Sequence, residues 1–239
     1  MTIPGWLQRV SIDWTDFDRA SRISSEIVQD LASDRALLRR LVLSVKRDDR
    51  LRFLAEKHDE LNYIVLYDAL DRGLRLRLHR FSKGLEDIPH NHRFSFSSAL
   101  LSGSYVHTLF QVERLDSEHE GQQPWSLHQP EGSHVGVAVR ELPLAGLEPQ
   151  LATVQAAGSS YSLHHSTIHK TAMPVEDAYS VFCRGPAMKP CALQLQPDVK
   201  TYRWKFGQAN EAPRVVADRK MTDGEFERYV ESLEAAAVI

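Results

Sequence analysis

Cysteine, long apolar runs and an excess of charge of one sign are all scarce in this chain. Its 239 residues include only two cysteines, Cys183 and Cys191, which are too few for a disulfide framework. The formal net charge of -3 gives no electrostatic reason to expect nucleic acid or an anionic membrane as a partner. No apolar stretch approaches the roughly 20 residues that a membrane-spanning helix needs.

The first residues, beginning Met1-Thr-Ile-Pro-Gly5, lack the basic segment and apolar run that are typical of a secretory signal. The small number of cysteines agrees with a reducing compartment. Both features favour a cytoplasmic location.

Glycine and proline are absent between Trp6 and Leu70, which favours helices in that part of the chain. Apolar residues recur there at steps of three and four, as in Ile23, Ile27 and Leu31. We therefore expect residues 1–60 to form a helical segment that packs on the rest of the molecule, and we assign it no chemistry.

A different pattern runs from residue 61 to about residue 195, where short apolar or alternating runs are separated by Gly, Pro and Ser. The predicted strands are 61–67, 74–80, 94–101, 104–112, 135–139, 151–154, 160–163 and 179–183. Many short strands with turn signals between them predict a sandwich or barrel. Residues 61–200 are accordingly expected to form one mainly β domain, with an exposed loop at 116–133.

The remaining residues, 201–239, begin with a predicted strand at 201–206 and end in a predicted helix. Thr222 and Glu225 form a capping box, in which a hydroxyl at the start of a helix is followed three residues later by a carboxylate. An apolar stripe follows at Phe226, Tyr229, Val230 and Leu233. This pattern is typical of a helix that covers a core.

Two histidines, His90 and His92, are separated by one residue. Side chains alternate along a β-strand, so both imidazoles would lie on one face and could hold one metal ion. His169, from a distant strand, could complete the set and leave other coordination positions open. His164 and His165 are alternatives to His169, but adjacent residues in a strand face opposite ways, so at most one of them would point inward.

The segment around these histidines resembles the first motif of the cupin superfamily. Gly84, His90, His92 and Gly103 have the motif's spacing, and Phe96 stands where many cupins have Glu. The second cupin motif is more degenerate here. It keeps Gly158 and His169, while His164, Ser166 and Met173 replace its Pro, Gly and Asn.

The resemblance implies a double-stranded β-helix, or jelly-roll barrel, with an N-terminal helical layer and a C-terminal helix around it. It also implies that His90, His92 and His169 bind a metal. Phe96 cannot bind a metal, so the implied site holds three neutral imidazoles and no carboxylate. Three-histidine cupins include the thiol dioxygenases, which use iron. Fe²⁺ is therefore the expected metal, with Zn²⁺, Mn²⁺ and Ni²⁺ as alternatives.

The chain also departs from the thiol dioxygenases. An ungapped alignment places Ile64 where those enzymes have an Arg that holds the substrate carboxylate, and Phe96 where the mammalian type has a crosslinked Cys. Cysteine is therefore not predicted as the substrate.

Several other side chains are candidates for the site. His107 and Tyr105 share a strand face after the first motif and are the candidate catalytic residues, although a buried structural histidine is the alternative for His107. Arg75, Arg77 and Arg80 could bind an acidic substrate or form a solvated strand face. Apolar walls are expected from Phe94, Phe96, Leu100 and Leu109.

Three classes of function remain open. The first is an iron-dependent dioxygenase or oxygenase that acts on a small organic molecule and O₂. The second is an isomerase, decarboxylase or lyase that uses another divalent metal, and the third is a non-catalytic cupin that binds a small molecule. The resemblance also favours a homodimer.

Overall fold

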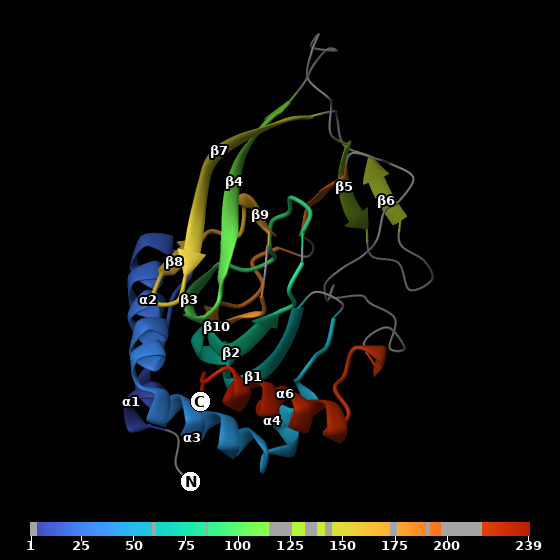
Figure 1. Ribbon diagram of the computed structural model, residues 1–239. Helices are drawn as coiled ribbons and strands as arrows, with labels where there is room; N and C mark the ends of the chain where they lie inside the picture. The colour runs from blue at the N-terminus through green and yellow to red at the C-terminus, as the bar shows by residue number, and fades with distance from the viewer. Residues whose placement is uncertain are drawn as a thin grey trace.

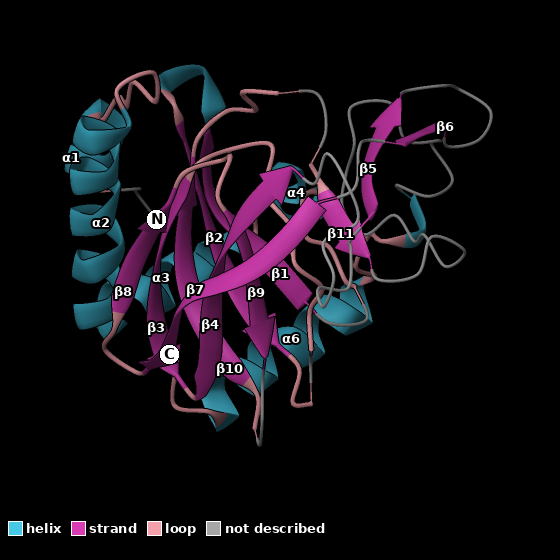
Figure 2. Cartoon of the chain, turned by 90° about the horizontal axis from the view of Figure 1, so that it is seen from above, coloured by secondary structure: helices cyan, strands magenta, loops and turns pink. Residues whose placement is uncertain are grey.

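The computed structural model describes residues 4–58, 61–84, 86–114, 126–131, 138–141, 145–172, 176–189, 192–196 and 217–239 (Figure 1). Within these ranges the chain folds into antiparallel β-sheets with helices packed along one side (Figures 1 and 2). The three predicted segments, 1–60, 61–200 and 201–239, remain a prediction about domains.

The largest sheet has five strands in the order β1-β2-β10-β3-β8. Their bounds are β1 Leu61–Ala69, β2 Leu74–Phe81, β10 Ala178–Arg184, β3 Phe96–Ser102 and β8 Ser160–Leu163. A three-stranded sheet, β7-β4-β9, lies opposite, and ring contacts such as Phe96–His169 and His107–Tyr161 join the two inner faces. Its strands are β7 Ala145–Ala156, β4 Ser104–Arg114 and β9 Ile168–Ala172. A smaller sheet contains β11 Gln194–Gln196, β5 Ser126–Glu131 and β6 Ala138–Glu141.

Alternation along β2 sorts its side chains between two environments. Leu74, Leu76 and Leu78 are fully buried in the core that the five-stranded sheet shares with the helices. Arg77 and His79 have the opposite parity and face the second sheet. Strand β10 is divided in the same way, because Val181 and Cys183 join the helical core whereas Phe182 packs on Phe96 inside the barrel. The residues that the five-stranded sheet contributes to the surroundings of the candidate site therefore come from its inner face.

The helices cover the outer face of the five-stranded sheet. Helix α2 lies along β3, β8 and β10, while α3 and α4 pack on β1 (Figure 1). The bounds are α1 Gly5–Arg9, α2 Phe17–Ser33, α3 Arg35–Val45, α4 Asp49–Phe53 and α6 Asp223–Ala235, with a short 3-10 turn, η1, at Leu70–Arg72. An aspartate caps each of α2, α3 and α4 by accepting a hydrogen bond from a backbone N–H in the first turn; these caps are Asp16, Asp34 and Asp48.

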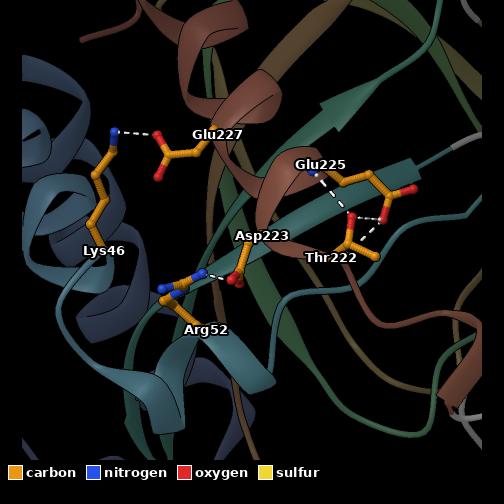
Figure 3. Close-up of polar contacts among 6 residues, drawn as sticks. All are labelled: Lys46, Arg52, Thr222, Asp223, Glu225 and Glu227. Carbon is orange, nitrogen blue, oxygen red and sulfur yellow. Dashed lines mark hydrogen bonds and ion pairs between the residues drawn. The ribbon is translucent and has the colours of Figure 1, made fainter.

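The C-terminal helix α6 begins at the predicted capping box. The Thr222 hydroxyl accepts a hydrogen bond from the Glu225 N–H, and the Glu225 carboxylate accepts one from the Thr222 N–H (Figure 3). The predicted apolar stripe of α6 is buried. The Tyr229 hydroxyl donates to the Leu78 carbonyl at 2.6 Å, which ties α6 to the outer face of β2. Two ion pairs, Lys46–Glu227 and Arg52–Asp223, join α6 to the preceding helical layer (Figure 3).

Glycines of the two cupin-like motifs occupy turns that only glycine adopts without strain. Gly103 has a φ of +76° between β3 and β4, and a Cβ there would lie 2.6 Å from the Asp177 carbonyl oxygen. Gly158 has a φ of +91° in the turn before β8. The left-handed conformation is costly for residues that carry a Cβ, so the spacing of these glycines reflects the positions of the barrel's turns.

The predicted jelly-roll class is confirmed, with helices against one side and a C-terminal helix. Most predicted strands are present with shifted ends, but β9 and β11 were not predicted. The predicted loop at 116–133 is wrong over Ser126–Glu131, which forms β5 paired with β6 and β11. The predicted strand at 201–206, Met173 and Cys191 lie outside the described residues.

We predict that Thr222→Ala lowers the free energy of unfolding by about 1 kcal/mol, because the cap of α6 loses its side-chain acceptor. Urea denaturation followed by far-UV circular dichroism measures this loss. Lys46→Ala is the matched control, since it removes only a surface ion pair to the same helix and should cost less than Thr222→Ala. Equal stability of Thr222→Ala and wild type would contradict the structural role of the cap.

Candidate metal centre

The structure brings the three predicted histidines together. One ring nitrogen from each of His90, His92 and His169 lies within 4.8 Å of the others. His169 comes from β9, whereas His90 and His92 come from the segment between β2 and β3. His90 and His169 are each only 4% exposed, so the cluster lies inside the barrel.

A single antiparallel β-bridge holds two of the three rings together. The His90 N–H donates to the His169 carbonyl at 2.8 Å, and the His169 N–H donates to the His90 carbonyl at 2.8 Å. The expectation that His90 and His92 share a regular strand is therefore wrong, because only this isolated bridge forms there. The two side chains nevertheless reach the same point, with 4.8 Å between their ring centroids.

The neighbours of His90 fix which of its nitrogens carries a proton. His90 Nδ1 lies 2.8 Å from the Ile88 carbonyl oxygen and 3.2 Å from an Asp87 carboxylate oxygen. Both neighbours are acceptors, so Nδ1 donates and the neutral ring keeps its lone pair on Nε2. Partners of this kind orient histidine ligands in metal sites.

His107 plays the corresponding role beside His169. His107 Nε2 lies 2.8 Å from His169 Nδ1, while His169 Nε2 lies 2.8 Å from His92 Nε2. A proton on His169 Nδ1, donated to His107, directs the His169 Nε2 lone pair toward His92. Two ligands at right angles on a metal, each about 2.1 Å away, would lie about 3 Å apart, close to the observed His92–His169 separation.

Burial keeps these imidazoles neutral. Burial, followed by the charges of neighbouring histidines, holds the pKa of His169 well below its usual range. Burial is also the main cause of the low pKa of His92, and it lowers the pKa of His107 to about 4. Neutral imidazole is the form that binds a metal, so His92 and His169 are already in the binding form at neutral pH.

Aromatic rings enclose the cluster. The Phe96 ring centroid lies 5.0 Å from that of His92, and Phe96 is 2% exposed. Phe96 packs with Leu163 and Phe182, and Phe94 and Leu109 adjoin that group. The predicted apolar surroundings are therefore present, except that Leu100 belongs to a separate cluster with Tyr105.

Tyr105 is connected to His107 through Tyr161. Its hydroxyl is 2.9 Å from that of Tyr161, and the Tyr161 ring is 4.5 Å from the His107 ring, centroid to centroid. Burial raises the pKa of Tyr105 well above its usual range and that of Tyr161 to about 12, so both hydroxyls keep their protons. A catalytic role for Tyr105 or His107 remains a prediction.

His164 and His165 lie outside the cluster. The His164 ring makes an edge contact with Phe17 at 5.1 Å and its Nδ1 lies 2.7 Å from the Ser166 hydroxyl. His165 Nδ1 lies 3.3 Å from the Ser95 hydroxyl.

Among the described residues, only His90, His92 and His169 group as potential metal ligands. Three convergent imidazole nitrogens, two of them from rings oriented through their Nδ1 atoms, suit a divalent transition metal.

Other polar groups near the site did not emerge from the sequence. Alternation along β2 places His79 and Arg77 on one face, since their parity is the same, but it does not show that this face turns into the barrel. Arg184, at the end of β10, carried no sequence signal, because which face of β10 turns inward depends on the helices that cover the other.

No family model matches the chain, and no curated protein matches it. It is similar to DMSP lyase DddQ from Ruegeria pomeroyi DSS-3, with 9% identity, a TM-score of 0.35, and 59% of this chain and 56% of the lyase covered. An RmlC-like cupin from Shewanella frigidimarina NCIMB 400 gives 18% identity, a TM-score of 0.34, and 56% and 85% coverage. A variant of Bacillus subtilis oxalate decarboxylase gives 9% identity, a TM-score of 0.34, and 56% and 28% coverage.

The chain thus spans less than two thirds of the lyase and of the decarboxylase. The strand arrangement and the three-histidine cluster confirm the resemblance to cupins at the level of fold and site. No helix among the described residues is long and apolar enough to cross a membrane.

We predict that His107→Ala weakens metal affinity about 10- to 100-fold, because His169 loses the partner that fixes its tautomer. Competition with a chromogenic chelator measures the affinity. His107→Gln retains a hydrogen-bonding group and should restore part of the affinity, which a purely packing role would not explain. His164→Ala is the control and should bind metal as the wild type does; a similar loss in His164→Ala would argue against the role of His107.

Proposed function

We propose that the protein is a metal-dependent enzyme whose metal is held by His90, His92 and His169. Fe²⁺ is the favoured metal, and the favoured reaction is dioxygenation of a small organic molecule. The observation that carries the proposal is the convergence of three imidazole nitrogens without a carboxylate, two of them from the buried residues His90 and His169 and one from the partly buried His92. A bound iron would supply a Lewis-acidic, redox-active centre with positions open to the substrate and O₂.

The ligand set favours anionic substrates. Three neutral imidazoles leave the full positive charge of a divalent ion uncompensated, whereas the carboxylate of many cupins would reduce it. Phe96, which replaces that carboxylate, contributes only an apolar face beside His92. A substrate that brings its own negative charge would therefore be stabilised there.

The protein's own residues would orient and enclose the reacting groups. His107 orients the His169 ring by contacting His169 Nδ1, and Asp87 orients the His90 ring by contacting His90 Nδ1. Phe94, Phe96 and Phe182 exclude water, which strengthens electrostatic interactions inside the barrel. His107 is also a candidate to relay a proton, because its Nε2 lies 2.8 Å from His169 Nδ1 and its pKa of about 4 keeps the ring neutral at neutral pH.

An isomerase, decarboxylase or lyase with Zn²⁺, Mn²⁺ or Ni²⁺ is the alternative enzyme class, because the same three imidazoles bind those metals. A non-catalytic cupin that binds a small molecule is the third. The homodimer and the cytoplasmic location remain predictions.

Elemental analysis of protein purified without chelator or added metal tests the proposal. We expect about one iron per chain in the wild type and in His165→Ala, and little metal in His169→Ala, because only His169 belongs to the cluster. Circular dichroism of all three proteins verifies that the fold is retained. Absence of metal from the wild type after reconstitution would refute the metal site. Stoichiometric zinc, manganese or nickel would favour the alternative enzyme class instead.

Phe96→Glu tests whether the fourth ligand position is within reach of residue 96. We expect this variant to bind divalent metal more tightly than the wild type, because the carboxylate adds a ligand and a charge. Without metal, it should be less stable by about 2 kcal/mol or more, since the carboxylate is buried without a partner. Phe94→Glu is the comparison, because Phe94 is another ring in contact with His92 but does not occupy the motif position of the missing Glu. Unchanged metal affinity in Phe96→Glu would show that a side chain at position 96 does not reach the metal.

A further inference from the structure

Two arginines on the inner face of the five-stranded sheet lack acidic partners. Arg184, at the end of β10, is only 7% exposed, and Arg77 on β2 is partly buried. The Nε atom of each has no hydrogen-bond partner. Within the part of the chain that the structure describes, neither guanidinium forms an ion pair, although buried charges are normally paired.

Aromatic rings cover the faces of both guanidinium groups. The Arg77 Cζ atom lies 4.0 Å from the centroid of the Tyr63 ring, and the Arg184 Cζ atom lies 4.2 Å from that of Phe94. Such stacking stabilises the cations through their flat faces. The N–H donors lie in the plane of each guanidinium and point past the rings, so the groups can still bind an acceptor edge-on.

The carboxylates of the neighbouring strand are already engaged. Asp68 on β1 is shared between Arg75, at 2.7 Å, and Arg50, at 3.0 Å. Arg184 lies directly across from Arg75 in the β2–β10 ladder, where like charges are unfavourable. The inner face therefore carries an excess of positive charge at this point.

The Glu56 carboxylate also has other partners already. Its carboxylate accepts hydrogen bonds from the Tyr63 hydroxyl at 2.5 Å and from the Lys220 ammonium at 2.8 Å. Burial acts to raise the pKa of Glu56, but these partners and His58 lower it further than burial raises it. Glu56 thus forms its direct ion pair with Lys220 and not with Arg77.

Two more polar atoms without partners lie on the same face. His79 Nε2 and the Ser180 hydroxyl are both buried and unbonded, and His79 and Ser180 are opposite each other in the β2–β10 ladder. Together with Arg77 and Arg184 they form a set of unsatisfied polar groups. A buried set of this kind suits a polar ligand better than an apolar one.

Phe94 and Phe96 connect this set to the three histidines. The Phe94 ring lies 5.5 Å from the His92 ring, centroid to centroid, on one side and under the Arg184 guanidinium on the other. Phe96 is the partner of Arg184 in the β3–β10 ladder and also contacts His92. Phe94 and Phe96 therefore border both the arginines and the histidine cluster, which places the two sets of groups next to each other.

We propose that Arg77 and Arg184 bind the carboxylate of a small organic acid whose other end reaches His90, His92 and His169. The second half of this statement rests on the proposed function, whereas the carboxylate site does not. Guanidinium groups recognise planar carboxylates edge-on through two parallel hydrogen bonds. A carboxylate is proposed because its two coplanar oxygens match the two in-plane N–H donors along one guanidinium edge, and tetrahedral phosphate serves as the comparison anion.

Calorimetric titration and thermal unfolding of the metal-free full chain test the carboxylate site. The probes are acetate, succinate, benzoate and inorganic phosphate, at constant pH and ionic strength with chloride as the other anion. We expect at least one carboxylate to bind saturably and raise Tm, and its Kd to rise about tenfold or more in Arg77→Met and in Arg184→Met. Arg80→Met is the control, since Arg80 lies on the opposite face of β2 and pairs with Asp177; its Kd should match the wild type.

Arg184→Lys supports the test if a methionine variant fails to fold. It keeps the charge but not the planar pair of donors, so its Kd should also be weaker than that of the wild type. An unchanged Kd in Arg184→Lys or Arg184→Met would overturn the proposal. So would a wild type that binds none of the three carboxylates, or one that binds phosphate as tightly as the best carboxylate.

Comparison of the wild type with and without metal separates this inference from the proposed function. The carboxylate response through Arg184 should be present in the metal-free protein. If iron binds but no carboxylate does, only the inference about the arginines fails. If a carboxylate binds through Arg184 but the wild type binds no metal, the proposed enzyme fails and the carboxylate site remains.

Discussion

The β-bridge between His90 and His169 is the constraint on which the arrangement of the site depends. Its two reciprocal backbone hydrogen bonds bring a loop segment before β3 against β9, although the two residues are far apart in sequence. Imidazoles on flexible loops would lose conformational entropy on binding a metal. Here the backbone has already incurred that loss, and the Nδ1 partners of His90 and His169 fix the remaining freedom of the rings.

The two faces of the five-stranded sheet have different roles. The outer face contributes stability, and the inner face lines the candidate site. Its outer face is apolar and buried under the helices, with Leu74, Leu76 and Leu78 on β2 as an example. Its inner face carries Arg77 and His79 from the same strand, with polar atoms that lack partners. Unsatisfied polar groups are costly in a folded protein, so the outer core must supply the stability that the inner face does not. Departures from the usual rules of burial are expected where a protein binds a ligand.

Local chemical signals made much of the fold predictable. The capping box at Thr222 and the alternation along β2 each follow from short-range geometry, whereas the strand that His90 and His92 were expected to share is absent. Strand β9 escaped prediction because its five residues, Ile168–Ala172, include Lys170 and Thr171 and lack a regular apolar pattern. Strand β5 contains a proline and lies in a polar stretch, and only its pairing with β6 and β11 makes it a strand.

The site was predictable only in part, for a similar reason. The motif spacing indicated the three histidines, but the partnership of His107 with His169 depends on how β4 and β9 pair. Parity alone could not show which face of β2 turns inward, because the helical layer decides it. The isolated bridge at His90, in place of a regular strand, depends on contacts across the barrel.

The pairing of distant strands has a consequence for how the molecule folds. Strand β2 pairs with β10, and the Tyr229–Leu78 hydrogen bond joins residues 151 positions apart. Long loops must close before such contacts form, which makes folding slow relative to proteins with local contacts. The three imidazoles come together only when β9 is paired with β4 and bridged to His90, so a metal that binds all three would stabilise the completed barrel over partly folded forms.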